Sequence, residues 1–272
     1  MRLFFLGTAA AEGYPGIFCD CPNCNEARAL GGRNLRCRSA LLVNDNLIID
    51  FGPDLLAASL RFNKNLSLAT TGLVTHAHSD HFYISNFEMR KPDLTGGLEI
   101  PFMRLYGPRD VRDALDRTFP DLAAYRIDSH TVRALDTWHN DGYTFTAYQA
   151  HHAVGHLDAL FYSIEDGRRS VLYATDTGLF PEATWHALAG KSFDVIILEE
   201  TMGYASYSEH IGFKEFVAVA NRMRAEVMLR PGGRLIAHHF SHTGNPVHQK
   251  IEAVLNPHGV EVAYDGLEIN LD

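Results

Sequence analysis

The sequence predicts an α/β protein built as an αββα sandwich, in which two β-sheets pack face to face and helices cover their outer faces. Apolar or β-branched runs of strand length recur in both halves of the 272-residue chain, and segments of helical character interrupt them. A hydrophobic content of 46% allows a sizeable core. No short-period repeat and no low-complexity linker divides the chain, so residues 1–272 are expected to form one domain.

The composition also narrows the classes of function. A net charge of −9 argues against a general nucleic-acid-binding surface, although bound divalent cations would still allow a phosphate substrate. No apolar run approaches the roughly 20 residues that a membrane-spanning helix needs. The apolar run near the first residue is shorter than the roughly 7–15 residues of a signal peptide, so Arg2 to Leu6 is read as the first strand. We therefore expect a cytoplasmic protein without a membrane partner.

The loop and the hairpin that follow this strand both bear on a site. The small-residue loop from Gly7 to Gly16 can lie close to a site; the alternative is that its glycines and prolines only turn the chain. Ser39 to Val43 and Leu47 to Asp50 are predicted to form a β-hairpin. Asp50, at the end of this hairpin, either orients a ligand histidine or caps the helix expected from Pro53 to about Phe62.

Three of the four cysteines lie in the cluster Cys19-Asp20-Cys21-Pro22-Asn23-Cys24. In a cytosolic chain this clustering indicates metal binding rather than disulfide formation. Three thiolates need a fourth donor to complete a tetrahedral structural zinc site, and the candidates are Cys37 and a distant histidine. Unpaired, buried thiols are the alternative interpretation.

Four potential metal ligands follow a buried strand in the segment Leu73–His81. Alternate side chains of an extended segment share a face, so His76 and His78 can bind one ion together. Asp80 and His81 come where the chain should turn into a short helix, and they would point towards a second ion. Imidazole and carboxylate ligands favour zinc, manganese or iron over calcium and magnesium. A solvated, histidine-rich loop is the alternative.

Further elements are expected along the rest of the chain. Helices are predicted over Phe82–Arg90, Val111–Phe119 and about Phe213–Met228, and the segment Pro120–Ser129 is predicted to be irregular and to form part of a pocket wall. Strands are predicted over Met103–Tyr106, Thr131–Leu135, Tyr143–Ala150, Leu160–Ile164, Ser170–Ala174, Phe193–Glu200 and the run that begins at Arg234.

Several of these strands end in further histidines and carboxylates. One histidine of the Ala150–His156 turn is expected to complete the first ligand set, and Asp176 can bridge two ions, unless it only forms a turn before Gly178. His210 precedes a helix, whose dipole tends to lower the pKa of a histidine unless a nearby anion opposes it.

Together these motifs resemble those of metallo-β-lactamase-fold hydrolases, from Gly7-Thr8 to Asp265-Gly266. The resemblance implies a two-metal centre of zinc or manganese, and it favours His152 over His151 through the likeness of Gln149–His152 to the family's Pro-x-x-His turn. His156 would face solvent or substrate. The implied ligands are His76, His78 and His152 on one ion, Asp80, His81 and His239 on the other, and Asp176 between them.

Within this superfamily the chain is most similar to PhnP-type cyclic-phosphate phosphodiesterases, because it carries the cysteine insert. The resemblance implies that His242 joins Cys19, Cys21 and Cys24 around a structural zinc, and that His210 and Asp80 take part in catalysis. Two departures, His238 in place of the family's Thr and a longer segment between His152 and Tyr162, bear on the substrate.

The implied activity is hydrolysis of a phosphodiester, such as a small cyclic phosphate or nucleotide, by metal-bound hydroxide. The alternatives are a thiolester or lactone hydrolase on the same centre, or a non-hydrolytic binding protein like those of PQQ biosynthesis. The resembled enzyme is a dimer, so a homodimer is a further expectation.

Overall fold

Two seven-stranded sheets lie face to face in the structure, a computed structural model that describes residues 1–272. In spatial order the first sheet contains β14 (Glu268–Asn270), β1 (Arg2–Gly7), β2 (Ala40–Val43), β3 (Leu47–Ile49), β4 (Thr71–Leu73), β5 (Met103–Gly107) and β6 (Ile127–Thr131). The second contains β13 (Glu261–Val262), β12 (Leu229–His238), β11 (Phe193–Glu199), β10 (Ser170–Ala174), β9 (Leu160–Glu165), β8 (Tyr143–Gln149) and β7 (Thr137–Asn140).

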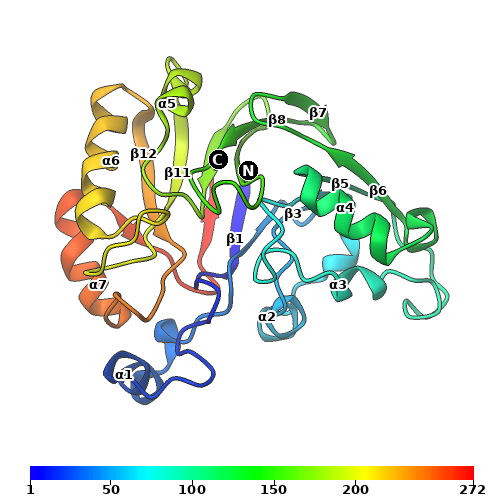
Figure 1. The fold of residues 1–272 in the computed structure, drawn as a ribbon, viewed down its shortest axis with the longest axis horizontal. Coiled ribbons are helices and arrows are strands. Elements are labelled where there is room, and N and C mark those ends of the chain that lie inside the picture. Colours follow the sequence, from blue (N-terminus) through cyan, green and yellow to red (C-terminus); the bar gives the residue numbers. More distant parts are fainter.

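Helices cover the outer faces of both sheets (Figure 1). The helices are α1 (Pro22–Leu30), α2 (Leu55–Phe62), α3 (Ser85–Glu88), α4 (Arg109–Thr118), α5 (Glu182–Leu188), α6 (Phe213–Ala225) and α7 (His248–Leu255). Figure 1 shows α6 and α7 outside the second sheet, and α2, α3 and α4 on the side of the first. No helix has the length and apolar character needed to cross a membrane. The αββα sandwich predicted from the sequence is confirmed.

The alternation of side chains along the strands explains this layering. On β1, Leu3 and Phe5 belong to the core between the sheets, whereas Phe4 and Leu6 belong to the core that contains the buried side of α2 and α4. Successive side chains of a strand point to opposite faces, so a continuous apolar run supplies both cores. Phe5 is fully buried, and its replacement by alanine is expected to cost about 3–5 kcal/mol.

The elements of the first sheet and the segments after it differ from the prediction at three places. The predicted helix Phe82–Arg90 is only the short α3, because Phe82 forms a β-bridge with Phe51 and the Tyr83 amide donates to the Phe51 carbonyl at 2.9 Å. The chain before it is therefore a turn rather than a helix at Asp80 and His81.

The other two differences lie at the edge of the first sheet. The strand expected over Thr131–Leu135 is β6, shifted to Ile127–Thr131, where it pairs with β5 in parallel. The segment Pro120–Ser129, predicted to be irregular, contains a 3-10 turn over Leu122–Tyr125 and the first residues of β6. The hairpin of β2 and β3 and the strands β8 to β12 form where the sequence placed them, within a few residues at their ends.

Candidate metal centre

The candidate donors lie where strands from both sheets end. The first sheet supplies Asp50 after β3 and the segment His76–His81 after β4, and the second supplies His152, Asp176 and His239 after β8, β10 and β12. Asp50, Asp176 and His239 have positive φ angles of 65°, 49° and 63°. Non-glycine residues rarely adopt this left-handed conformation, and functional sites are one place where the surrounding structure holds them in it.

Three ring nitrogens converge in the first donor group. His76 Nε2 lies 2.9 Å from His78 Nδ1, and His152 Nε2 lies 3.1 Å from the same atom. Two nitrogens on one tetrahedral zinc, each about 2.0–2.1 Å from the metal, would be about 3.3 Å apart. The group therefore has the spacing of three ligands around one ion.

The second donor group shares His81 as its centre. His81 Nε2 lies 3.1 Å from Asp80 Oδ2, 2.9 Å from Asp176 Oδ2 and 3.3 Å from His239 Nε2. His239 Nε2 lies 3.0 Å from the same Asp176 oxygen. All four side chains are buried, so two carboxylates and two imidazoles are held together away from water.

Asp176 connects the two groups. Its Oδ2 contacts His81 and His239, and its Oδ1 lies 3.8 Å from His152 Nε2 in the first group. Oδ2 is buried, yet it makes no hydrogen bond with either histidine. A buried carboxylate oxygen without a hydrogen bond is costly unless a cation accompanies it. The two donor groups, with one carboxylate oxygen directed to each, therefore fit a pair of metal ions.

The electrostatics of the two groups also suit cations. Burial lowers the pKa of His76 well below its ordinary value and lowers the pKa of His152 too, so both rings are neutral at pH 7, the form that binds metals. Burial opposes a charge on His81, but Asp176 and Asp80, with Asp50 behind them, raise the pKa of His81 well above its ordinary value. The carboxylates of Asp80 and Asp176 thus favour a positive charge at His81 Nε2, whether it is a proton or a metal cation.

Hydrogen bonds behind the donors fix their orientation. Asp50 Oδ2 lies 2.7 Å from His81 Nδ1, and its Oδ1 accepts from the Thr75 amide at 2.8 Å. His239 Nδ1 lies 2.9 Å from the Thr201 hydroxyl, which donates to Glu199. Such partners fix which nitrogen of a ring is free to bind a metal. Asp50 therefore has the position of a residue that orients a ligand histidine rather than that of a helix cap.

His210 lies beside the donors and is held by Glu199. His210 Nδ1 is 2.8 Å from Glu199 Oε2, and its ring centroid is 4.8 Å from that of His152. Although burial opposes its charge, the Glu199 carboxylate raises the pKa of His210 to about 9. The lowering expected from the helix that follows does not occur, because the neighbouring anion outweighs the helix dipole.

A cavity of about 470 Å³ opens onto these side chains. Its lining includes the donors His78, Asp80, His152, Asp176 and His239 together with His210, and the backbone loop that holds Ala10 and Ala11 forms one wall. The sequence left open whether the Gly7–Gly16 loop lies near a site or only turns the chain, and it did not identify Glu12, Met202 or Thr243 in this wall. The signals available in the sequence were indirect: Glu12 lies in the small-residue loop, and Thr243 follows the histidine-rich end of β12.

The remaining histidines of the site region lie apart from the donors. His151 joins neither group, and His156 is exposed and does not line the cavity. His238 is buried behind the site, with its Nε2 at 3.1 Å from the Ser39 hydroxyl. The departure from Thr at this position therefore concerns the core rather than the cavity.

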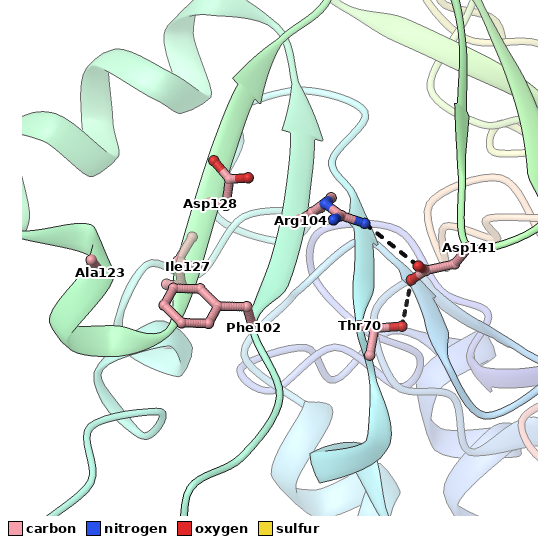
Figure 2. A pocket seen from close by; sticks show the side chains of 7 residues that line it. All are labelled: Thr70, Phe102, Arg104, Ala123, Ile127, Asp128 and Asp141. Atoms are coloured by element: carbon pink, nitrogen blue, oxygen red, sulfur yellow. Dashed lines mark hydrogen bonds and ion pairs between the residues drawn. The ribbon is translucent and has the colours of Figure 1, made fainter.

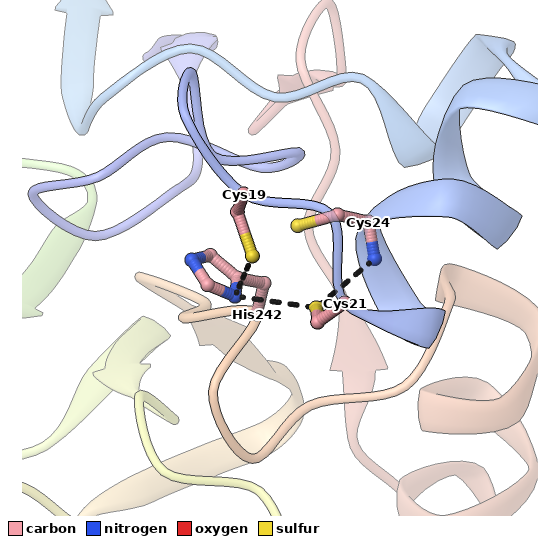
Figure 3. A group of neighbouring side chains, drawn as sticks. All are labelled: Cys19, Cys21, Cys24 and His242. Atoms are coloured by element: carbon pink, nitrogen blue, oxygen red, sulfur yellow. Dashed lines mark hydrogen bonds between the residues drawn. The ribbon is translucent and has the colours of Figure 1, made fainter.

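Cys19, Cys21, Cys24 and His242 form a second, separate cluster, shown in Figure 3. His242 Nδ1 lies 3.7 Å from the sulfurs of both Cys19 and Cys21, and a tetrahedral zinc with one nitrogen and one sulfur ligand would separate them by about 3.6 Å. Burial opposes ionisation of Cys21, but hydrogen bonding, first of all from the Cys24 amide, lowers its pKa to about 7. Burial raises the pKa of Cys24 to about 12, so Cys21 ionises first.

The fourth member of this cluster is the histidine and not Cys37. Cys37 lies outside the cluster, and its backbone amide donates to the Asp265 carboxylate at 2.6 Å. The donor set of three cysteines and one histidine is one that closed structural zinc sites use.

Another hollow, of about 540 Å³, lies at the edge of the first sheet (Figure 2). Phe102, Ala123 and Ile127 form its apolar part, and Arg104 faces Asp141 at 3.6 Å. Asp141 also accepts from the Thr70 hydroxyl at 2.6 Å, so its carboxylate already has partners. The predicted pocket wall Pro120–Ser129 thus lines this hollow and not the cavity over the metal-site donors.

Comparisons with known proteins agree with this geometry. The family model described as the β-lactamase superfamily domain matches residues 45–240. Coenzyme PQQ synthesis protein B of Cupriavidus necator is 29% identical, over 98% of both chains. Among solved structures, a diphosphatase of the PhnP family has a TM-score of 0.78 at 23% identity, covering 100% of this chain and 98% of its own.

Two further solved structures share the fold. Zn²⁺-bound PqqB from Methylobacterium extorquens has a TM-score of 0.80 at 20% identity, and the short form of human tRNase Z has a TM-score of 0.66 at 19% identity; both comparisons cover 100% of each chain. The family match covers most of the chain, including every strand end that carries a metal-site donor. The chain therefore belongs to the β-lactamase superfamily, and its fold is the metallo-β-lactamase αββα sandwich.

Proposed function

We propose that the protein is a dinuclear-metal hydrolase that cleaves a phosphodiester, such as a small cyclic phosphate or nucleotide, to a phosphomonoester. The observation that carries this proposal is the pair of donor groups joined by Asp176, with His210 at their side. Two divalent cations, when bound there, supply Lewis acidity that lowers the pKa of a water to about 7 and stabilises charge on phosphoryl oxygens. The whole chain, 1–272, would serve as one hydrolase domain.

The residues of the chain have separate parts in this proposal. His76, His78 and His152 would hold one cation, and Asp80, His81 and His239 the other, with zinc or manganese as the metal. Asp176 would keep the two sites at a fixed separation, because each of its oxygens is directed to a different group. The cavity above them would hold the phosphate against both sites and limit the water that reaches it.

His210 would act on the leaving group. Because Glu199 binds Nδ1, Nε2 is the ring nitrogen left to carry a proton towards the cavity. With a pKa of about 9 the ring is protonated at neutral pH, so it can bind the phosphate or give the Nε2 proton to the departing alkoxide. This step matters most where the leaving group is a poor one.

The direct test is turnover of a panel of cyclic phosphates by protein whose metal content is measured in the same sample. Bis-p-nitrophenyl phosphate, a thiolester and a lactone should be assayed in parallel, because the same Lewis acids can promote the hydrolysis of all three. We expect hydrolysis of the phosphodiesters with two active-site metal equivalents and one zinc in the cysteine cluster. Turnover confined to the thiolester or the lactone would reject the phosphodiesterase.

The similarity to coenzyme PQQ synthesis protein B supports a second candidate, a metal-dependent protein that binds a small molecule without hydrolysing it. Saturable binding of a small molecule by fully metallated protein, with no turnover on any ester of the panel, would favour this candidate.

A further inference from the structure

Glu12 is an acidic side chain at the metal-site cavity that belongs to neither donor group. The other carboxylates that line the cavity, Asp80 and Asp176, are both among the donors, and no lysine or arginine lines it. Beyond the donors, therefore, the part of the cavity around Glu12 presents a carboxylate without a lysine or arginine beside it.

The structure fixes one oxygen of Glu12 and leaves the other without a partner. The Ser241 hydroxyl donates to Glu12 Oε1 in a close contact, and Ser241 is itself buried and accepts from the Thr243 amide at 3.1 Å. Glu12 Oε1 also lies 3.7 Å from His242 Nε2, on the side of that ring opposite the cysteines. Oε2 makes no hydrogen bond, and the side chain is 33% exposed, so this oxygen can accept one from a ligand.

Arg38, the basic side chain that contacts the loop next to Glu12, does not offset the charge of Glu12. Arg38 Nε donates to the Ala11 carbonyl at 2.8 Å, next to Glu12 in the chain. The guanidinium of Arg38 pairs with Asp54, with 2.9 Å between Nη1 and Oδ1. A second anionic group brought beside Glu12 would consequently find no free lysine or arginine to bind.

We propose that Glu12 is a specificity-determining residue that favours ligands whose part beyond the reacting phosphate is uncharged and carries hydroxyl groups. This inference rests on the proposed phosphodiesterase function and narrows its substrate class. A ligand hydroxyl can donate to Oε2 in a charge-assisted hydrogen bond. A second phosphate about 5 Å away would be repelled, which lowers affinity roughly tenfold for a partly exposed pair.

Calorimetric binding to the metallated protein tests this proposal without requiring turnover. The probes are adenosine 3′-monophosphate and adenosine 3′,5′-bisphosphate, which differ by one phosphate. The variant Glu12→Gln keeps an acceptor for Ser241 and removes the charge, and we expect it to shift the ratio of the two Kd values roughly tenfold towards the bisphosphate. Asp20→Asn is the matched control, because it removes an exposed charge beside the same cysteines without facing the cavity, and its ratio should equal that of the wild type.

Three outcomes would overturn the assignment. An equal ratio in wild type and Glu12→Gln would mean that the charge is not felt by the ligand, and binding of neither probe would mean that the cavity does not take this class. Loss of a zinc equivalent in Glu12→Gln would mean that Glu12 acts by orienting His242 instead.

The failure of this inference is distinguishable from failure of the proposed function. Wild-type protein that hydrolyses cyclic phosphates but shows an unchanged Kd ratio in Glu12→Gln refutes only the role of Glu12. A ratio that shifts as expected, in protein that cleaves no diester, refutes the phosphodiesterase and leaves the role of Glu12 in ligand selection.

Discussion

Replacing Glu199 by glutamine should move the alkaline limb of the pH–rate profile to lower pH. Glu199 is the main reason that the pKa of His210 is about 9 rather than the ordinary 6.5. At pH 8 a histidine of pKa 9 is about 90% protonated, whereas one of pKa 6.5 is about 3% protonated. If protonated His210 assists the leaving group, Glu199→Gln should reduce kcat/KM about thirtyfold at pH 8 and less than about twofold at pH 6.

The assay is kcat/KM for a cyclic phosphate between pH 5.5 and 9.5, with metal content measured for each protein. Glu200→Gln is the matched control. Burial raises the pKa of Glu200 well above its ordinary value, and this neighbouring carboxyl accepts from the Gly203 amide at 2.9 Å rather than pairing with His210, so its replacement should leave the profile unchanged. A Glu199→Gln enzyme that keeps its metals and loses the same factor at pH 6 and pH 8 would refute the role assigned to His210.

The remaining predictions concern the metals directly. The variants Asp176→Asn and His78→Ala should each lose one or both active-site metals and show no turnover. The control His151→Ala, next to the donors but outside them, should keep both metals. Full activity of Asp176→Asn or His78→Ala would reject the donor assignment. His210→Ala should retain both metals and slow hydrolysis by about a hundredfold or more for poor leaving groups, and a fall in metal content would instead make His210 a ligand. Cys21→Ser should lose one zinc equivalent and lower Tm by about 5 °C or more, since bound zinc contributes about 2.7 kcal/mol at a hundredfold excess over its Kd; unchanged metal and Tm would exclude a zinc site.

The sequence was most informative where a donor directly follows an apolar strand. His76, His78 and Asp176 could be placed because the strand that positions each is adjacent in the chain, and its apolar character is visible. The choice between His151 and His152 was different, since both lie in a turn whose path is set by contacts with distant residues. Spacing alone left that choice open.

Two kinds of feature could not be predicted from the sequence: contacts between segments that are distant in the chain, and strands at the edges of the sheets. The contact between Ser241 and Glu12 joins residues 229 positions apart, and nothing local to either indicates it. Strands β6 and β7 carry several polar, exposed side chains because each lies at the edge of a sheet, so neither has the apolar alternation by which strands are recognised. The anion that sets the pKa of His210 lies 11 residues earlier, in a different element.

The division of the donors between the two sheets has a consequence for how the protein matures. Neither the amino-terminal half, with His76 to His81, nor the carboxyl-terminal half, with Asp176 and His239, can assemble a complete coordination sphere alone. High-affinity cation uptake must therefore wait until the halves have docked, and once it occurs it opposes their separation. Removal of the metals by a chelator should accordingly weaken the packing between the two sheets before either sheet unfolds.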